Sequence, residues 1–128
     1  MYWAIELSKE TSNRIQNLIA LAVRIPEEWI VYCDHITVAH PKQLTSGWEE
    51  IDNILSNFEG HSVTFKITNI AQNENVIAVG VSAKTLNEHS HITVACAPGH
   101  KPVESNNLTE WTPVICFEDF SGRLVKKK

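Results

Sequence analysis

Two short stretches of the chain, His35-Ile36-Thr37-Val38-Ala39 and His91-Ile92-Thr93-Val94-Ala95, carry the same five residues in the same order. Val, Ile and Thr favour β-strands, in which successive side chains point to opposite faces. In each copy we expect His, Thr and Ala on one face, and Ile and Val on the other. The apolar faces suit a core. If the two polar faces meet, two imidazoles and two hydroxyls line one groove.

The residues around these stretches alternate between strand and helix patterns. Predicted strands cover about 2–7, 29–40, 63–70, 76–81, 89–97, 111–120 and 122–125, and predicted helices cover 8–23 and 46–58. Ser46 and Glu49 have the Ser-x-x-Glu spacing of a capping box at the second helix. The pattern divides into two similar halves, each with one copy of the repeated strand. This internal duplication with mostly antiparallel strands predicts an α+β fold and one domain over residues 1–128.

Composition favours an ordinary globular protein. Hydrophobic residues make up 43% and charged residues 20% of the chain. No apolar run approaches the roughly 20 residues of a membrane span, and the N-terminal strand pattern lacks the basic region of a signal peptide. We therefore expect no membrane association and a cytoplasmic protein. Three cysteines at unrelated spacings, Cys33, Cys96 and Cys116, predict neither a disulfide framework nor a zinc knuckle.

The charge balance argues against a grip on long nucleic acid. Eleven Lys and Arg residues face 15 Asp and Glu residues, which gives a formal net charge of −4. Binding to a long polyanion usually needs a basic face. The only dense basic run is 126–128, at an end that we expect to be frayed. A small anionic ligand is the better prediction.

The repeated His and Thr residues suit cleavage of a phosphodiester. One imidazole can accept a proton from the nucleophile, and the other can donate a proton to the leaving oxygen. The two threonine hydroxyls can donate hydrogen bonds to the non-bridging oxygens, where charge develops. Ala39 and Ala95 are expected to keep the groove open. This chemistry requires neither a metal nor another cofactor, and either histidine could be the base.

Other interpretations of the same residues stay open. The repetition could arise by chance, in which case His-Ile-Thr-Val is an ordinary strand. His89 and His91 could form half of a metal site, with His35 or His40 as further ligands. Cys33 would share a face with His35, although a small buried side chain is its more common role.

The two His-x-Thr-x motifs resemble those of the two-histidine (2H) phosphoesterases, which carry them on facing strands. The resemblance implies a bilobal α+β fold, with two pseudo-symmetric, mostly antiparallel sheets, helices outside and a central groove. It also implies that His35 and His91 are catalytic, that Thr37 and Thr93 bind phosphate, and that no metal takes part. The expected enzyme is a phosphoric diester hydrolase.

The segment Lys101-Pro102-Val103-Glu104-Ser105-Asn106, after the second motif, is similar to the branch that holds phage anti-CBASS nucleases and related RNA-repair-type phosphoesterases. This resemblance implies hydrolysis of small cyclic nucleotides or oligonucleotides, such as the second messengers of antiviral signalling, in the host cytoplasm if the protein is viral. The alternatives are opening of 2′,3′-cyclic phosphates at RNA ends, or a non-catalytic nucleotide-binding module.

Four further residues are predicted to contact the substrate. Tyr2 and Trp48 are placed to stack on a base, although most aromatic residues belong to a core. Lys101 follows the second motif strand and could reach a phosphate, with Lys42 and Lys84 as less favoured choices. Glu118 could accept a hydrogen bond from a guanine edge.

Overall fold

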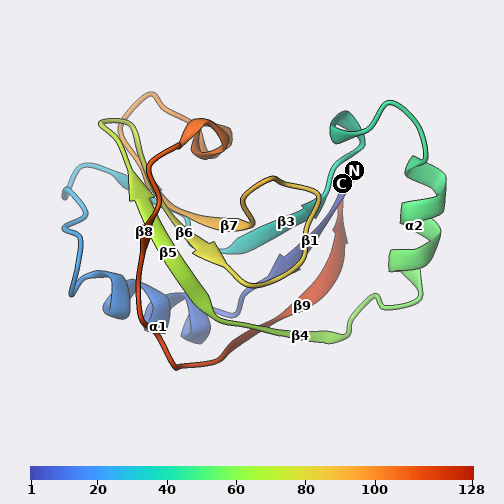
Figure 1. Cartoon of the computed structure of the whole chain (residues 1–128), viewed down its shortest axis with the longest axis horizontal. Coiled ribbons are helices and arrows are strands. Elements are labelled where there is room, and N and C mark those ends of the chain that lie inside the picture. Colours follow the sequence, from blue (N-terminus) through green and yellow to red (C-terminus); the bar gives the residue numbers. More distant parts are fainter.

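A computed structural model describes all residues, 1–128, and its centre is one curled antiparallel sheet (Figure 1). Its strands are β1 (Tyr2–Glu6), β2 (Ile30–Val31), β3 (His35–Ala39), β4 (Ser62–Phe65), β5 (Ile67–Gln72), β6 (Val76–Val81), β7 (His91–Cys96), β8 (Thr112–Pro113) and β9 (Phe120–Lys127). The helices are α1 (Lys9–Ile19) and α2 (Trp48–Ser56), and the 3₁₀ turns are η1 (Pro41–Gln43) and η2 (Pro102–Asn107). No helix of the fold has the length and apolar content that crossing a membrane requires.

The two motif strands form the middle of the sheet. The strand order is β4-β9-β1-β3-β7-β6-β5-β8, so three strands lie beyond β3 and three beyond β7. A single residue pair, Ile36 with Ile92, joins β3 to β7, and both side chains are fully buried. The α+β fold with two similar lobes is confirmed. The lobes are halves of one continuous sheet, because this pair bridges them.

Both motif strands contain a β-bulge directly after the threonine. Successive residues of β1 pair with Thr37 and Ala39, which leaves Val38 as an extra residue in β3. Successive residues of β6 pair with the threonine and the last alanine of the second copy, which leaves Val94 as an extra residue in β7. An extra residue bends the strand and interrupts its alternation. The duplication therefore includes backbone geometry as well as side chains.

The bulges change where the two motif alanines point. Ala39 is 1% exposed and packs in a cluster with Trp3 and Leu124, while Ala95 is fully buried in the main core. The prediction that these alanines line the groove is wrong, because strict alternation ends at the bulge. Each motif strand thus presents only its His and Thr to the polar side.

Each helix covers part of the sheet. Helix α1 starts at Ser8, whose Oγ accepts a hydrogen bond from the Thr11 N–H at 3.1 Å, and it buries Ile15 and Ile19 in the main core. Helix α2 packs on the smaller cluster around Trp3, whose indole N–H donates to Asp52 at 2.8 Å. In Figure 1 the two helices lie outside the sheet, at separate ends of the molecule. Residues of η1 and η2 line a common cavity between these two turns.

Three predicted elements differ from the structure in their boundaries. Helix α2 begins after Gly47, which has φ of 87° and makes no side-chain cap, so Ser46 does not form the predicted capping box. Helix α1 ends at Ile19 instead of residue 23. The predicted strand over 63–70 is divided into β4 and β5 at Lys66, whose N–H donates to Ser82 Oγ at 2.9 Å. The turn between β5 and β6 is held by hydrogen bonds from the Asn75 and Val76 N–H groups to Asn73 Oδ1.

The C-terminal part differs most from the prediction. Only Thr112 and Pro113 of the predicted strand over 111–120 pair with β5, and proline restricts such a strand to a sheet edge because it lacks an N–H. The lysines at the end are not frayed. Lys126 pairs with Asp52 at 2.9 Å, and Lys127 pairs with Glu6, so β9 is ordered to its last residues.

Candidate active site

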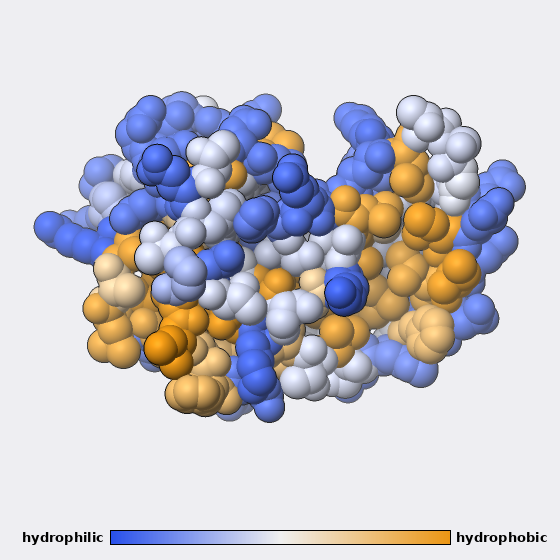
Figure 2. Space-filling view, viewed as in Figure 1, coloured by the Kyte–Doolittle hydropathy of each residue, from blue (hydrophilic) through white to orange (hydrophobic).

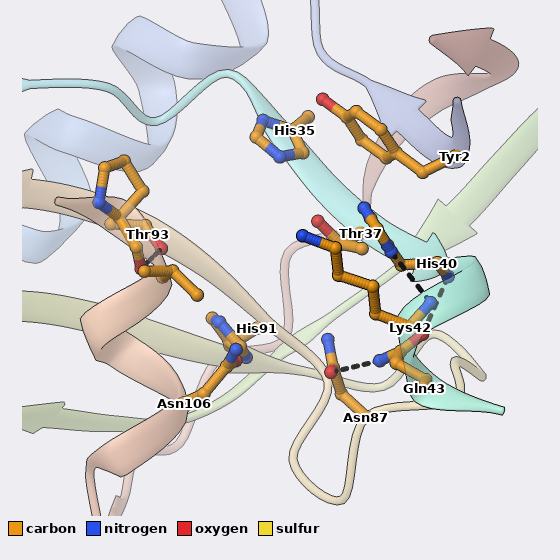
Figure 3. A pocket seen from close by; sticks show the side chains of 12 residues that line it. Tyr2, His35, Thr37, His40, Lys42, Gln43, Asn87, His91, Thr93 and Asn106 are labelled. Atoms are coloured by element: carbon orange, nitrogen blue, oxygen red, sulfur yellow. Dashed lines mark hydrogen bonds between the residues drawn. The ribbon is translucent and has the colours of Figure 1, made fainter. Parts of the chain in front are cut away.

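A polar cavity of about 390 Å³ lies where the two lobes meet, on the side of the sheet that carries both motif threonines. The surface in Figure 2 is hollowed between the lobes that carry η1 and η2 in Figure 1. Twelve residues line the cavity: Tyr2, His35, Thr37, His40, Lys42, Gln43, Asn87, His91, Thr93, Pro102, Val103 and Asn106. Both His-x-Thr motifs therefore meet at one cavity (Figure 3).

The first motif histidine is oriented by an exposed carboxylate. His35 Nδ1 lies 2.8 Å from Asp34 Oδ1, and the imidazole is half-buried. An Nδ1–H that donates to this carboxylate leaves Nε2 for the cavity. The Tyr2 ring lies beside it, with ring centroids 6.2 Å apart. The orientation of His35 thus depends on a charged neighbour that water reaches.

The second motif histidine is oriented by the backbone. His91 Nδ1 lies 2.7 Å from the carbonyl oxygen of His89, so it carries the proton and leaves Nε2 as an acceptor in the neutral ring. Burial lowers the pKa of His91 below its ordinary value of 6.5. The hydrogen bond to His89 opposes this, and the positive charges of His35 and His89 add to it. His91 is therefore held neutral near pH 7, as a base requires.

The two threonine hydroxyls have different partners. The Thr37 hydroxyl makes no hydrogen bond within the protein, so its proton is free for a ligand. Thr93 Oγ1 lies 2.5 Å from the Oγ of buried Ser105, which donates to the carbonyl oxygen of Pro102 at 2.5 Å. A hydroxyl has only one proton. Thr93 Oγ1 also donates to the carbonyl oxygen of Pro102 at 3.3 Å, and either hydroxyl can donate in the contact between Thr93 and Ser105. The Thr93 proton is therefore engaged within the free protein.

Each motif strand is followed by a 3₁₀ turn of the same design. Each turn begins with a proline, and the third residue of the turn reaches back to the residue before it. In η1, Gln43 Oε1 accepts from the His40 N–H at 2.8 Å, and in η2, Glu104 Oε2 accepts from the Lys101 N–H at 2.8 Å. The position after the proline lines the cavity in both turns. It is Lys42 in η1 but Val103 in η2.

The lysine of η1 gives the cavity a positive charge. Figure 3 shows the Lys42 side chain extending along the cavity toward Thr37. His40 lies next to it, and its Nδ1 accepts from the Lys42 N–H at 3.1 Å. Burial, then the charges of Lys42 and the N-terminal ammonium group, lower the pKa of His40. This end of the cavity offers a fixed charge and a neutral imidazole to a bound anion.

Of the eight predicted site residues, the structure brings five to the cavity, namely Tyr2 and the two His-Thr pairs. It does not bring Trp48, Lys101 or Glu118 there. Trp48 packs with the cluster around Trp3, and Glu118 pairs with Arg14. Lys101 precedes η2 and is exposed outside the cavity lining.

Several cavity residues were not singled out as site residues from the sequence: His40, Gln43, Asn87, Pro102, Val103 and Asn106. Lys42, a less favoured choice than Lys101 in the sequence, lines the cavity, whereas Lys101 does not. A signal for the turn residues exists in hindsight, because a proline follows each motif strand within a few residues. Asn87 comes from the loop between β6 and β7, where its Oδ1 accepts from Gln43 Nε2 at 2.6 Å. No local pattern indicates that contact.

The structure supports neither a place for Cys33 in the groove nor the alternative metal site. Cys33 has φ of 45°, which breaks the alternation before β3 and turns its side chain into the core. Burial raises the pKa of its thiol to about 11. His, Cys, Asp and Glu side chains nowhere form a group of three or more that could hold one metal ion. The placement of His89 and His91 therefore gives the metal-site alternative no support.

Two imidazoles and two threonine hydroxyls at one cavity, in the middle of a bilobal antiparallel sheet, define the class of 2H phosphoesterases. Residues 10–119 match the family described as the fungal tRNA ligase phosphodiesterase domain, which is part of that superfamily. The chain belongs to this family and is a phosphodiesterase, that is, a phosphoric diester hydrolase. No curated protein and no solved structure is significantly similar to it.

Proposed function

We propose that this phosphodiesterase opens 2′,3′-cyclic phosphates at RNA ends by paired imidazole catalysis, without a metal. The observation that carries the proposal is the meeting of both His-Thr pairs with Lys42 at one cavity. The family description, which names a tRNA ligase, supports an RNA end as the substrate. We also propose that residues 1–128 form one such domain, and that it works in the cytoplasm.

In this proposal His91 is the general base and His35 the general acid. Nε2 of His91 takes a proton from water as the water oxygen bonds to phosphorus. Nε2 of His35 gives a proton to the ribose oxygen as the bond from phosphorus to that oxygen breaks. The lowered pKa of His91 and its fixed Nδ1–H support the role of base. Proton exchange with solvent then restores both rings.

Three donors stabilise the charge on the non-bridging oxygens. Thr37 has a free hydroxyl proton, and Lys42 supplies a positive charge. Thr93 donates only after its proton turns from Pro102 or Ser105 to the phosphate. The charge-assisted hydrogen bond to the phosphate is the stronger of the two, because its acceptor is ionised. The same groups stabilise a developing dianion more than the substrate monoanion.

A second candidate is hydrolysis of small cyclic oligonucleotides, including antiviral second messengers, as in the anti-CBASS resemblance of the segment over 101–106. One observation favours it: an aromatic ring lies beside each motif histidine, Tyr2 near His35 and Trp111 near His91. A diester with a nucleoside on both sides could use both rings. The net charge of −4 also suits a small anionic substrate. A non-catalytic nucleotide-binding module would not need an oriented base.

The test is turnover of a substrate panel by the pure protein in excess chelator. The panel holds an RNA that ends in a 2′,3′-cyclic phosphate, its linear 3′-phosphate counterpart as a control, and cyclic di- and trinucleotides. We expect the cyclic-phosphate end to react fastest, with no loss on chelation. Faster turnover of a cyclic oligonucleotide favours the second candidate. Activity that needs added zinc or manganese, or no turnover of any member, contradicts the proposed mechanism.

A further inference from the structure

Two stacked rings lie beside the second motif histidine, outside the lining of the cavity that contains Lys42. The Trp111 ring is 6.3 Å from that of His91, tilted by 46°, and it stacks on His89 with centroids 4.9 Å apart and planes at 13°. Trp111 is half-buried, and its indole N–H donates to the carbonyl oxygen of Leu108 at 3.3 Å. His89 is exposed. The pair is thus a fixed aromatic platform that solvent reaches.

A second polar cavity, of about 280 Å³, includes this platform in its wall. It shares Gln43, Asn87, His91 and Asn106 with the cavity that holds both motifs, so the two cavities adjoin. Its volume is near the lower end of ligand pockets, roughly 300 Å³. A ligand bound at His35 and His91 therefore lies next to the cavity that contains the platform.

The platform has a counterpart at the first motif. Tyr2 lies 6.2 Å from His35 and stacks on His40, with centroids 5.8 Å apart and planes at 23°. Each motif histidine is thus flanked by an aromatic ring that stacks on another histidine. The two platforms lie at different ends of the combined cavities, and only the Tyr2 platform lines the cavity that contains Lys42.

We propose that Trp111 and His89 form a nucleobase-binding shelf for the nucleotide next to the one whose phosphate reacts. The inference rests on the proposed function, because the cavity between the motifs must hold that phosphate. A base stacked on the outer face of His89 continues the pair into a three-ring stack, and stacking tolerates any base. The amide groups of Asn87 and Asn106 lie between the cavities and can hydrogen-bond to its edge. The preferred substrate then has at least two nucleotides.

The test compares a ribonucleoside 2′,3′-cyclic phosphate with a diribonucleotide that ends in the same cyclic phosphate. The wild type should have a kcat/KM at least about fivefold higher for the diribonucleotide, the lower limit for one stacked base. Trp111→Leu and His89→Ala should remove this advantage, because each should lower kcat/KM for the diribonucleotide far more than for the mononucleotide. The His89 variant keeps the carbonyl that orients His91, because that hydrogen bond is to the backbone.

Trp48→Leu is the matched control, because it also removes an indole but at the cluster around Trp3, outside both cavities. It should keep the advantage of the diribonucleotide. Equal kcat/KM for both substrates in the wild type overturns the shelf. So does an equal loss for both substrates in the Trp111 variant, or loss of the advantage in the Trp48 variant.

Binding measurements test the nucleobase shelf even if the proposed catalytic function is wrong. If the wild type turns over neither substrate, the proposed function fails, and calorimetry with the mono- and diribonucleotide 3′-phosphates decides about the shelf. Tighter binding of the diribonucleotide, lost in Trp111→Leu and kept in Trp48→Leu, supports the shelf. Equal binding of the two ligands by the wild type overturns it.

Discussion

The two motif strands carry the same five residues, but their His and Thr side chains have different hydrogen-bond partners. His35 is oriented by the carboxylate of Asp34, whereas His91 is oriented by a backbone carbonyl and has a lowered pKa. The Thr37 hydroxyl has no partner in the protein, whereas the Thr93 hydroxyl is bound to Ser105 and Pro102. The motif itself thus supplies two equal pairs of groups. Their neighbours make one pair suited to hold a base and leave the other for the acid.

The 3₁₀ turns after the two strands also share a backbone design and differ in one side chain that lines the cavity. Both begin with a proline and close with a hydrogen bond from the third residue to the residue before the turn. The equivalent cavity position is Lys42 in one and Val103 in the other. Positive charge therefore enters from the first half alone. A duplicated backbone gives two similar walls, and single substitutions between the copies make the site asymmetric.

Removing either imidazole should have the largest effect. His35→Ala and His91→Ala should each lower kcat/KM by at least about a hundredfold, because each removes one proton-transfer group. His61→Ala is the control, since His61 is exposed and packs on Phe58 away from the cavity. The measurement is steady-state kinetics with far-UV circular dichroism for each variant. Near wild-type activity in either motif variant contradicts the two-imidazole mechanism.

Substitution of either threonine should lower kcat, but only substitution of Thr93 should also lower the free energy of unfolding. Thr37→Val and Thr93→Val should each lower kcat by about ten- to a hundredfold, less than the loss of a full oxyanion-hole donor because Lys42 remains. Only Thr93→Val should also lower the free energy of unfolding, by about 1 kcal/mol, because it removes the partner of buried Ser105. Urea unfolding and kinetics of both variants measure this. Equal stability losses would show that the two hydroxyls are equivalent.

The lysines test the asymmetry of the turns. Lys42→Met should lower kcat/KM by several-fold to about tenfold, because it removes the positive charge beside the phosphate. Lys101→Met is the matched control and should have little effect, since Lys101 lies outside the cavity. The salt dependence of KM should weaken only in the Lys42 variant. The reverse result would restore Lys101 as the phosphate-binding lysine.

The smallest expected effect is on stability against pH. The pKa of His91 is lowered in the folded protein, so the unfolded chain binds more protons below pH 6.5. The contribution of neutral His91 to the free energy of unfolding is fully present above pH 6.5 and is lost as the pH falls through the folded-state pKa. His91→Gln should therefore show a flatter fall in unfolding free energy between about pH 6.5 and 5. A steeper fall in the variant would contradict the neutral imidazole.

The sequence predicts the fold and the paired motifs because both rest on local patterns. Apolar alternation identifies β3 and β7, and the repeated residues indicate that they face each other. The bulges after Thr37 and Thr93 depend on pairing with other strands, so Ala39 and Ala95 could not be placed. The cavity lysine was missed for a related reason. Which lysine enters depends on the direction of each 3₁₀ turn.

The strand predicted over 111–120 shows a different limit. Its apolar residues favour a strand, yet only Thr112 and Pro113 pair with β5, and Phe120 already belongs to β9. Glu118 pairs with Arg14 and Asp119 with Lys66, across more than a hundred and more than fifty residues of sequence respectively. Such long-range charge pairs leave no periodic signal. The structure does not support the predicted contact of Glu118 with a base edge, and the sequence does not indicate its ion pair with Arg14.

The assignment of acid and base is tested most directly with a leaving group that needs no proton. A nucleoside p-nitrophenyl phosphodiester releases p-nitrophenolate, so loss of the general acid should matter little for it, while the base is still required. For His35→Ala, the loss of kcat/KM relative to the wild type should be at least about tenfold smaller on this substrate than on the natural diester. For His91→Ala, the loss should be the same on both substrates. Recovery of His91→Ala alone, or of both variants equally, would contradict the roles assigned to the two identical strands.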